Sequence, residues 1–505
     1  MQVCHHLRKF SKNIINGCEY SDDGKILIRA ALCYTSIVVP EGVECIKEKA
    51  FYNVTTLQKI LLPTTLLKIG ARVFCGCRNL KELNIPRGTI EIGEAAFAYT
   101  GIDKINIPGS VEHLPKEAFS FSDVKEVVFE EGVLSIGESA FDNCELDNII
   151  FPDSLESIED KAFAYVDGEP HIVLPDNVKS IGAEAFYGCS EFKFEGDLPY
   201  NLQNIGDEAF VDCRFNAPIT LSKNLVNIGK GAFVGCELTV AENHSAFVIG
   251  DGVIYTANYH KAISSYGKSD KINVAPQTLS IGEKAFKHAT FLKKVKLPKD
   301  LKEIGNEAFW GCENLKEIVL PRCLSKIGMM AFFGSGLQYI TVPKEVTDYT
   351  LAFANSEIRH CTVLSERISD SAFSMCSNLE AISLGKEVKD IGCDAFMGCS
   401  SLTEYTIPEG IVTIGKRAFQ GCENLSRISI PSSVKEIGEQ AFSCCESLKE
   451  VFVKGYVNKW GKFMFFASKN IEMVYVGTKL YKKLMRKTKS YDHWLTERLW
   501  EVQKW

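Results

Sequence analysis

The sequence contains no long apolar run and no catalytic signature. None of its 505 residues belongs to a stretch of about 18 consecutive apolar residues, so no transmembrane helix is predicted. The first residues, MQVCHHLRKFSKN, are polar and basic, and we expect no secretory signal peptide there. The motifs GxGxxG after a strand, the P-loop, HExxH and GxSxG are all missing. We therefore predict a protein that is not an enzyme and uses no cofactor.

Positive charge is scarce outside the C-terminal end. The net charge is −7, and residues 479–505 hold eight Lys or Arg against three Asp or Glu, which leaves −12 for residues 1–478. An acidic body argues against general or specific nucleic-acid binding. The basic end keeps one alternative open, an anionic partner bound through this tail. Residues 490–505 have an amphipathic pattern, and we expect a helix there that covers the last repeat.

The histidines and cysteines do not occur at metal-ligand spacing. The nine histidines are scattered, and the one close pair is His5–His6 near the N-terminus. Cys75-Gly-Cys77 has no matching second pair of the kind that zinc requires. Asp251-Gly252 lacks the rest of a calcium loop and is interpreted as a turn. We therefore predict no metal site.

What the sequence has in abundance is one repeated unit. Residues 414–430 read IGKRAFQGCENLSRISI, and residues 437–453 read IGEQAFSCCESLKEVFV, 23 residues later. The Phe of this Ala-Phe pair returns 18 times from Phe51 to Phe465, mostly every 22 to 24 residues. A fixed period in this range is typical of a solenoid, in which each unit buries its apolar side only against its neighbours.

Each unit has two parts with different patterns. The part LxxIxIP alternates like a short strand with one buried face, and its proline ends the strand. The part IGxxAFxGC contains a glycine that we expect to permit a backbone turn, followed by an Ala-Phe pair that fills the interior. The predicted fold is a solenoid with a parallel sheet on one face and short strands with tight helical turns on the other. The predicted repeat core includes Phe97, Phe141, Phe186, Phe233, Phe309, Phe396, Phe419, Phe442, Cys312, Cys399 and Cys422.

Ten of the nineteen cysteines occupy one repeat position, three residues after the Phe. A residue that recurs at one phase has a shared packing role, so we interpret these cysteines as small buried hydrophobes with free thiols. Many unpaired thiols favour a reducing compartment such as the cytoplasm.

Two hairpins and one irregular stretch depart from the repeat. A hairpin with Asp23-Gly24 at its turn is expected at residues 18–29, and a second one around Asp251-Gly252 fills part of the 53 residues between Phe233 and Phe286. The second hairpin is similar to the first, as if a new array began there. The Phe spacing also shrinks to 21 and 20 residues between Phe332 and Phe373, where we expect a local distortion. The predicted segments are an N-terminal cap at 1–36, a first array at 37–238, an inserted hairpin element at 239–272, a second array at 273–476 and a basic cap at 477–505.

The unit LxxIxIPxxVxxIGxxAFxGC resembles the BspA-type leucine-rich repeat, also called the Treponema pallidum class. The resemblance covers about residues 37–476, and it extends to the hairpin FVIGDGVIY and to the terminal VYVGTKLYKK. It implies a curved or superhelical, horseshoe-like solenoid and a role in binding. It also implies that a location at the cell surface and adhesion to host matrix or to other cells are alternatives to a cytoplasmic scaffold.

Outward positions of the predicted sheet are candidates for binding a protein partner. In LxxIxI the residues on either side of the second apolar position point away from the core. Neighbouring units place apolar side chains there, and contiguous exposed apolar surface is a candidate binding patch. The predicted partner-binding residues are Val128, Ile150, Val173, Tyr339, Phe452 and Tyr475. The sequence thus predicts a non-enzymatic scaffold for protein–protein interaction, without indicating the partner or the oligomeric state.

Overall fold

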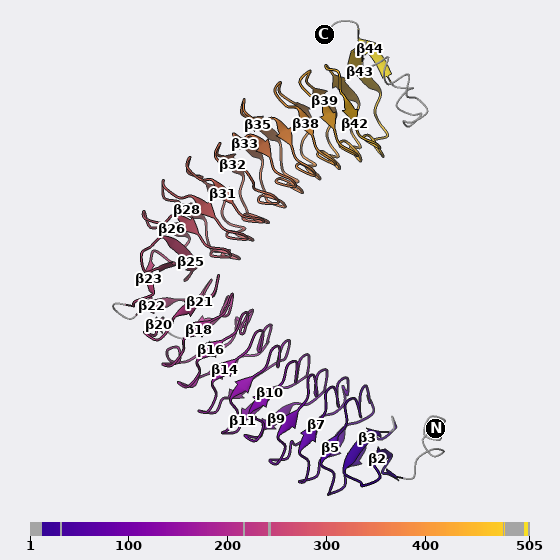
Figure 1. The fold of residues 1–505 in the computed structure, drawn as a ribbon, viewed down its shortest axis with the longest axis vertical. Helices are drawn as coiled ribbons and strands as arrows, with labels where there is room; N and C mark the ends of the chain where they lie inside the picture. The colour runs from indigo at the N-terminus through magenta and orange to yellow at the C-terminus, as the bar shows by residue number, and fades with distance from the viewer. Residues whose placement is uncertain are drawn as a thin grey trace. The chain divides into compact units, whose positions relative to one another are not determined.

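The computed structural model describes residues 13–30, 33–215, 218–240, 244–477, 479 and 499–502. They form two compact units that divide between Val248 and Ile249, within the segment expected to hold the inserted hairpin. Each unit is a stack of coils with strands running across it (Figure 1). The predicted solenoid with a parallel sheet along one face is confirmed.

The first unit begins with a hairpin and continues with two strands per coil on most coils. The hairpin strands are β1 (Ile14–Ile15), β2 (Cys18–Tyr20) and β3 (Ile26–Ala30). The sheet-face strands are β4 (Ser36–Val38), β6 (Lys59–Leu61), β9 (Lys104–Ile107), β11 (Glu126–Phe129), β13 (Asn148–Ile150), β15 (His171–Ile172), β17 (Lys193–Phe194), β19 (Arg214–Phe215), β20 (Ile219–Leu221) and β22 (Leu238–Val240). The short strands of the opposite side are β5 (Cys45–Ile46), β7 (Lys68–Ile69), β8 (Glu91–Ile92), β10 (His113–Leu114), β12 (Ser135–Ile136), β14 (Ser157–Ile158), β16 (Ser180–Ile181), β18 (Asn204–Ile205) and β21 (Asn227–Ile228).

The second unit repeats this plan. Strand β23 (Phe247–Gly250) contains the division point, and β24 (Val253–Thr256) and β25 (Lys261–Ser265) form the second hairpin. The sheet-face strands are β26 (Lys271–Asn273), β28 (Lys294–Lys296), β30 (Glu317–Ile318), β32 (Tyr339–Val342), β33 (His360–Val363), β35 (Ala381–Leu384), β37 (Glu404–Thr406), β39 (Arg427–Ile430), β41 (Glu450–Val453), β43 (Met473–Gly477) and β44 (Leu499–Val502). The short strands are β27 (Ser280–Ile281), β29 (Glu303–Ile304), β31 (Lys326–Ile327), β34 (Arg367–Ile368), β36 (Asp390–Ile391), β38 (Thr413–Ile414), β40 (Glu436–Ile437) and β42 (Lys459–Trp460).

The segment around each Ala-Phe pair, here called the Ala-Phe loop, is a chain of tight turns and not a helical turn. The loop residues two before and two after the Phe have left-handed backbones, as at Lys49 (φ 60°) and Asn53 (φ 57°) around Phe51. As a result, the N–H groups of these three residues donate to the carbonyls of the next coil, for example Phe51 N to Val73 O at 3.0 Å. None of the described residues in 33–215, 218–240 and 244–477 is helical.

The repeated glycine four residues before the Phe has a different role from the one expected. None of the glycines at this position, such as Gly70 or Gly415, has a positive φ. A Cβ at Gly70 would instead meet Glu48 N of the preceding coil at 2.6 Å, and one at Gly415 would meet Gly392 C at 2.4 Å. The glycine is therefore required because neighbouring backbones approach closely, and the turn itself is made by non-glycine residues.

Phenylalanine rings form a continuous column inside each unit. From Phe51 to Phe233 and from Phe286 to Phe465, successive rings stack with centroids 4.9 to 6.0 Å apart. All eight phenylalanines expected in the repeat core have no exposed surface. Stacked aromatic pairs add to the stability given by area burial, so the column couples each coil to the next.

The repeated cysteines pack beside this column and also form hydrogen bonds. Each of the ten thiols donates to the carbonyl oxygen of the Phe one coil earlier, such as Cys399 Sγ to Phe373 O at 3.3 Å and Cys189 Sγ to Phe163 O at 2.9 Å. Cys312, Cys399 and Cys422 are fully buried. The ten cysteines of the repeat phase are all among the seventeen described cysteines that are free, as expected, whereas Cys33, outside this phase, is disulfide-bonded.

The local distortion expected between Phe332 and Phe373 is present on the short-strand side. No short strand is formed between β31 and β34, and Tyr349 occupies the position that glycine holds in other coils. Its buried ring contacts Phe353 and Phe373, and its hydroxyl donates to Arg367 O at 2.9 Å. On the sheet face β32 and β33 remain paired in register, so the distortion is confined to one side.

The described part of the C-terminal segment differs from the helix expected over residues 490–505. Leu499–Val502 is strand β44, which pairs in parallel with β43, with Tyr475 opposite Trp500. An open strand edge presents unpaired N–H and C=O groups, and pairing with them outweighs the amphipathic pattern. The cluster of cations at residues 480–489 lies outside the described residues.

Candidate functional site

Val128 and Ile150 lie side by side on the sheet face, as the alternation predicted. They are register partners across β11 and β13. Val128 is half-buried, and 49% of Ile150 is exposed. Glu126 is the outward residue before Val128 on β11. It forms an ion pair at 2.6 Å with its register partner on β9, Lys104. The apolar pair therefore has a charged border on one side.

Val173 is exposed but does not extend this ladder. Its side chain is 61% exposed, just after β15. Strand β15 contacts β13 but joins a different sheet, with β17 and β19. The sequence predicted one row of three apolar residues. Val128 and Ile150 are paired in one sheet, whereas Val173 follows a strand that belongs to another sheet.

The aromatic residues near the C-terminal end form a tighter cluster. Phe452 and Tyr475 are register partners on β41 and β43, and their rings stack with centroids 4.5 Å apart. The Arg427 guanidinium lies over the Phe452 ring at 4.6 Å from its centroid, and its Nε is 3.4 Å from Glu450 Oε2. Residues from three neighbouring coils thus form one outward-facing surface, which we call the Arg427–Tyr475 patch.

An open groove of about 340 Å³ adjoins the Arg427–Tyr475 patch. It runs across β37, β39 and β41 and combines carboxylate, hydroxyl, guanidinium and ammonium groups with two aromatic residues. Its lining residues are Glu404, Tyr405, Thr406, Arg427, Ser429, Phe452 and Lys454. This mixture can hold hydrogen-bonding and apolar groups of a ligand at the same time.

Tyr339 has a partner that the sequence did not indicate. Its ring is 54% exposed and stacks on His360 of the adjacent strand, with centroids 5.3 Å apart and ring planes 8° apart. Strands β32 and β33 hold the two residues in register. The register of the parallel ladder could have identified this pair, because both are the first residues of their strands.

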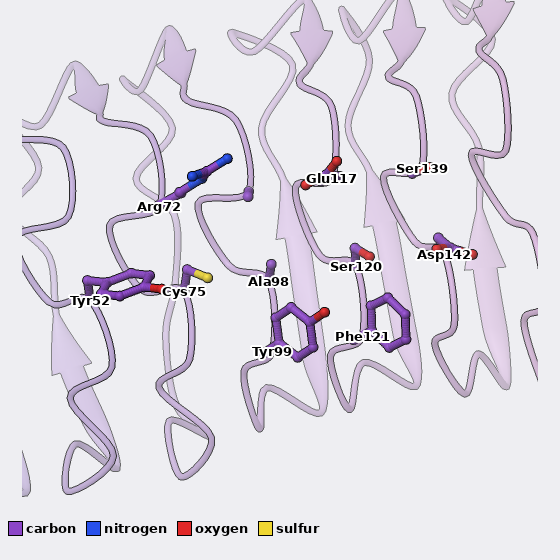
Figure 2. A pocket seen from close by; sticks show the side chains of 11 residues that line it. Tyr52, Arg72, Cys75, Ala98, Tyr99, Glu117, Ser120, Phe121, Ser139 and Asp142 are labelled. Atoms are coloured by element: carbon purple, nitrogen blue, oxygen red, sulfur yellow. The ribbon is translucent and has the colours of Figure 1, made fainter. Parts of the chain in front are cut away.

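A second groove, on the Ala-Phe loops of the first unit, was missed by the sequence analysis. It has a volume of about 330 Å³ and crosses the coils from Tyr52 to Asp142 (Figure 2). We call it the loop-face groove. Its signal in the sequence is that Tyr99 and Phe121 stand two residues after the repeat Phe, where neighbouring coils have Asn53 and Gly76.

The titratable groups of the interior are held neutral by burial. Burial raises the pKa of the Cys77 and Cys445 thiols to about 12 and that of Cys376 to about 11. Among the described residues there is no group of three or more His, Cys, Asp or Glu that could hold a metal ion. The described part of the chain also has no helix with the length and apolar character needed to cross a membrane.

Comparison with known proteins gives one family. The model of the BspA type leucine rich repeat region (6 copies) matches residues 30–146, 134–261, 259–367 and 366–486. No curated protein matches this chain.

Several solved structures are similar to the chain. A leucine-rich repeat protein from Eubacterium ventriosum matches with a TM-score of 0.50 and 23% identity, over 59% of this chain and 82% of that one, which shows the fold. A leucine rich cell surface protein from Faecalibacterium prausnitzii has a TM-score of 0.35 and 21% identity, over 88% and 94% of the two chains. The leucine rich repeat protein of T. pallidum has a TM-score of 0.22 and 25% identity, over 45% and 91%.

Proposed function

Because this chain belongs to the BspA-type leucine-rich repeat family, we propose that it is a protein-binding scaffold that holds its partner at the Arg427–Tyr475 patch. The observation that supports this site is the stack of an arginine on a phenylalanine on a tyrosine, all on the outward side of one sheet. Tyrosine and arginine are the residue types that most often anchor protein interfaces, together with tryptophan.

The scaffold reduces the entropic cost of binding at this patch. Strands β39, β41 and β43 are paired in register over four residues each, and the ring of Phe452 is held from both sides. Side chains that are ordered before binding lose less freedom on binding. The adjoining groove adds the polar groups of Glu404 and Lys454, which can fix the orientation of a partner segment.

The experiment compares capture by the intact chain with capture by a double variant, Phe452→Ala with Tyr475→Ala. Truncating two anchors at the centre of an interface costs about 2 kcal/mol or more, which weakens the Kd of a captured partner about thirtyfold. Tyr339→Ala is the matched control, because it removes an exposed, stacked aromatic residue of the same unit away from the patch. We expect the control to bind normally.

The same experiment can relocate the site. If the partner binds the aromatic double variant as it binds the unchanged chain, the Arg427–Tyr475 patch is not the interface. The next surface to test is the Val128–Ile150 pair, with Val128→Lys and Ile150→Lys, which places charge on an apolar face without disturbing the core. Loss of the partner in this second variant alone would place the interface on β11 and β13.

A further inference from the structure

The loop-face groove has a floor of small side chains and two unlike walls. Figure 2 shows Cys75, Ala98 and Ser120 in one row along the floor, with Tyr99 and Phe121 on one side. Arg72 and Glu117 stand on the opposite side. The floor residues each follow a repeat Phe, so the coil repeat itself aligns them. Because these side chains are short, the loops leave a trough that crosses several coils.

The aromatic wall is built at positions where the fold itself does not require aromatic residues. Tyr99 and Phe121 have left-handed backbones, with φ of 57° and 55°. A bulky residue is rare in this conformation, which glycine and asparagine tolerate best. The corresponding residues of neighbouring coils are Gly76 and Asn143. The turn therefore forms equally well with glycine or asparagine, so the two rings are not needed for the fold at these positions.

Both rings are available to a ligand. Tyr99 is 43% exposed and Phe121 is 45% exposed, and they stack with centroids 5.1 Å apart and ring planes 2° apart. Stacking uses one face of each ring. The outer face of Phe121 is directed to the next coil, whose corresponding residue, Asn143, carries no ring.

The end of the groove near Phe121 carries negative charge. Arg72, at the other end, is paired with Glu94 at 3.1 Å. Among the described residues, the one ion pair of Glu117 is distant, with Lys116 Nζ at 4.0 Å, and Lys116 also pairs with Glu138 at 2.8 Å.

Asp142 completes this acidic end. Within the described part of the chain no Lys or Arg forms an ion pair with Asp142. The nearby Lys161 pairs with Glu184 at 3.4 Å, and its charge acts on Asp142 only from a distance. Asp142 Oδ1 accepts a hydrogen bond from Asn143 Nδ2 at 2.9 Å. Partial burial raises the pKa of its carboxyl, and the charge of Glu117 adds to that effect, so a cation placed here would relieve both.

We propose that the loop-face groove binds an extended peptide segment of a partner protein, with an arginine side chain held between Phe121, Glu117 and Asp142. A planar guanidinium stacks on an aromatic face and forms forked hydrogen bonds with carboxylates, which suits this combination of groups better than an ammonium does. The recess between Tyr52 and Tyr99, over Cys75, accepts an apolar side chain of the same segment on its aromatic side, because the neighbouring Arg72 is already paired with Glu94.

The spacing of the coils sets the length of the segment. Successive interior rings along the groove are 4.9 to 5.5 Å apart. Cys75 and Asp142 are three coils apart, or about 15 Å, which an extended chain covers with four to five residues. The peptide that fits therefore has an apolar residue and an arginine four or five positions apart. This site lies in the first unit and is independent of the Arg427–Tyr475 patch.

The test is calorimetric titration of the full chain with a blocked, otherwise Gly/Ser peptide that carries leucine and arginine five positions apart. The control peptide has citrulline in place of arginine, which keeps the shape and removes the charge. We expect about tenfold weaker binding of the citrulline peptide, and a similar loss when the arginine peptide meets Glu117→Gln with Asp142→Asn.

Phe121→Asn separates binding from folding. Asparagine already occupies the same left-handed position at Asn53 and Asn143, so this variant should fold at least as well as the unchanged chain. It should lose binding of the arginine peptide. The matched control Tyr165→Asn changes the same loop position outside the groove and should bind as the unchanged chain does.

Three results would overturn the proposal. The first is equal binding of the citrulline and arginine peptides. The second is unchanged binding by the Phe121→Asn variant. The third is no heat of binding with the arginine peptide while a neutral oligosaccharide binds in a manner that depends on Phe121, which would assign the groove to a sugar. Phe452→Ala should leave peptide binding unchanged, so failure here and failure at the Arg427–Tyr475 patch are distinguishable.

Discussion

The two hairpins that begin the two units have the same construction with different side chains. In each, a left-handed pair joins the first two strands, Asn16-Gly17 between β1 and β2 and Asp251-Gly252 between β23 and β24. The pairing of β2 with β3 shifts register between Glu19 and Tyr20, and that of β24 with β25 shifts between Ile254 and Tyr255. A second array therefore starts inside the chain by the same means as the first.

The last residue of each hairpin performs the same task. Ala30 N donates to Ala50 O at 2.8 Å, and Ser265 N donates to Ala285 O at 2.6 Å. Ala50 and Ala285 are the alanines of the first Ala-Phe pair in each unit. The hairpins thus satisfy a carbonyl that a preceding coil would otherwise cover. Backbone geometry is shared, and the side chains differ.

The tyrosines of the two hairpins show the consequence of that difference. Tyr255 Oη accepts a hydrogen bond from Ala275 N at 3.0 Å. Tyr20 is the corresponding residue, and its buried hydroxyl, beside the Cys18 thiol, forms no regular hydrogen bond with the described residues. An aromatic ring fits both caps, but the hydroxyl groups have different surroundings, a backbone N–H at Tyr255 and the Cys18 thiol at Tyr20.

Alkaline pH should produce the largest effect and should act on both units alike. Each unit has five of the repeated thiols. Burial raises the pKa of nine of the ten above 9.0, to about 11 for Cys376 and to about 12 for Cys77, Cys144 and Cys445. A raised pKa means that the stability is complete below pH 9 and is lost as the pH rises toward the folded-state pKa. At pH 10 each thiol costs about 1.4 kcal/mol.

The measurement is the urea midpoint of unfolding between pH 8 and 11, followed by hydrogen exchange in each unit. We expect a steep fall above pH 9 with both units affected. A midpoint that stays constant to pH 10.5 would show that the thiols are not buried in the folded protein.

Removing one ring of the aromatic column tests whether the units are independent. Phe309→Ala leaves a cavity between coils of the second unit and should cost about 3–5 kcal/mol. Phe141→Ala is the matched change in the first unit. Because coils couple mainly to their neighbours, hydrogen-exchange protection should fall in the unit that carries the change. Equal loss of protection in both units from either variant would contradict this independence.

The smallest expected effect is a difference in the free energy of unfolding between variants of the two hairpin tyrosines. Tyr255→Phe leaves Ala275 N without its acceptor and should cost about 1–2 kcal/mol. Tyr20→Phe removes a hydroxyl without a regular hydrogen bond, and its free energy of unfolding should stay constant or rise. Chemical denaturation of both variants gives the comparison. Equal losses would mean that the Tyr20 hydroxyl has a partner in solution.

Much of the architecture could be predicted from the sequence because it depends on a period. The phase of the Ala-Phe pair identifies the interior column, and Asp23-Gly24 and Asp251-Gly252 mark turns of the two hairpins. Between Phe332 and Phe373 the shortened spacing predicted the break that Tyr349 now explains. These features are local in sequence or repeat at fixed distance.

Features that depend on contacts between coils could not be predicted in the same way. The repeated glycine was interpreted as a turn residue, but it is the space next to the preceding backbone that excludes a side chain at Gly70. The thiols were treated as apolar, although Cys399 and its equivalents donate hydrogen bonds. Strand β44 forms because β43 offers an edge, which no local pattern shows.

The candidate sites were only partly predictable for the same reason. Alternation indicated that Phe452 and Tyr475 point outward, but Arg427 joined them only through the register of neighbouring coils. The loop-face groove arises from side chains 22 or 23 residues apart at three different loop positions. Aligning all units by the repeat Phe would have revealed that Tyr99 and Phe121 depart from the usual Asn or Gly.

The hydrogen bonds of the Ala-Phe loops allow the protein to gain or lose whole coils. Each loop donates its N–H groups forward and offers its carbonyls backward, as in the bond from Phe51 N to Val73 O. When a whole coil is duplicated or deleted, the N–H donors of one loop still face the carbonyl acceptors of the next, so the hydrogen bonds form again. Coils of different length keep these bonds too, since Phe353 N still donates to Ala372 O at 3.0 Å across the 20-residue coil. Genes for such chains can therefore lengthen or shorten by whole repeats while the protein remains folded.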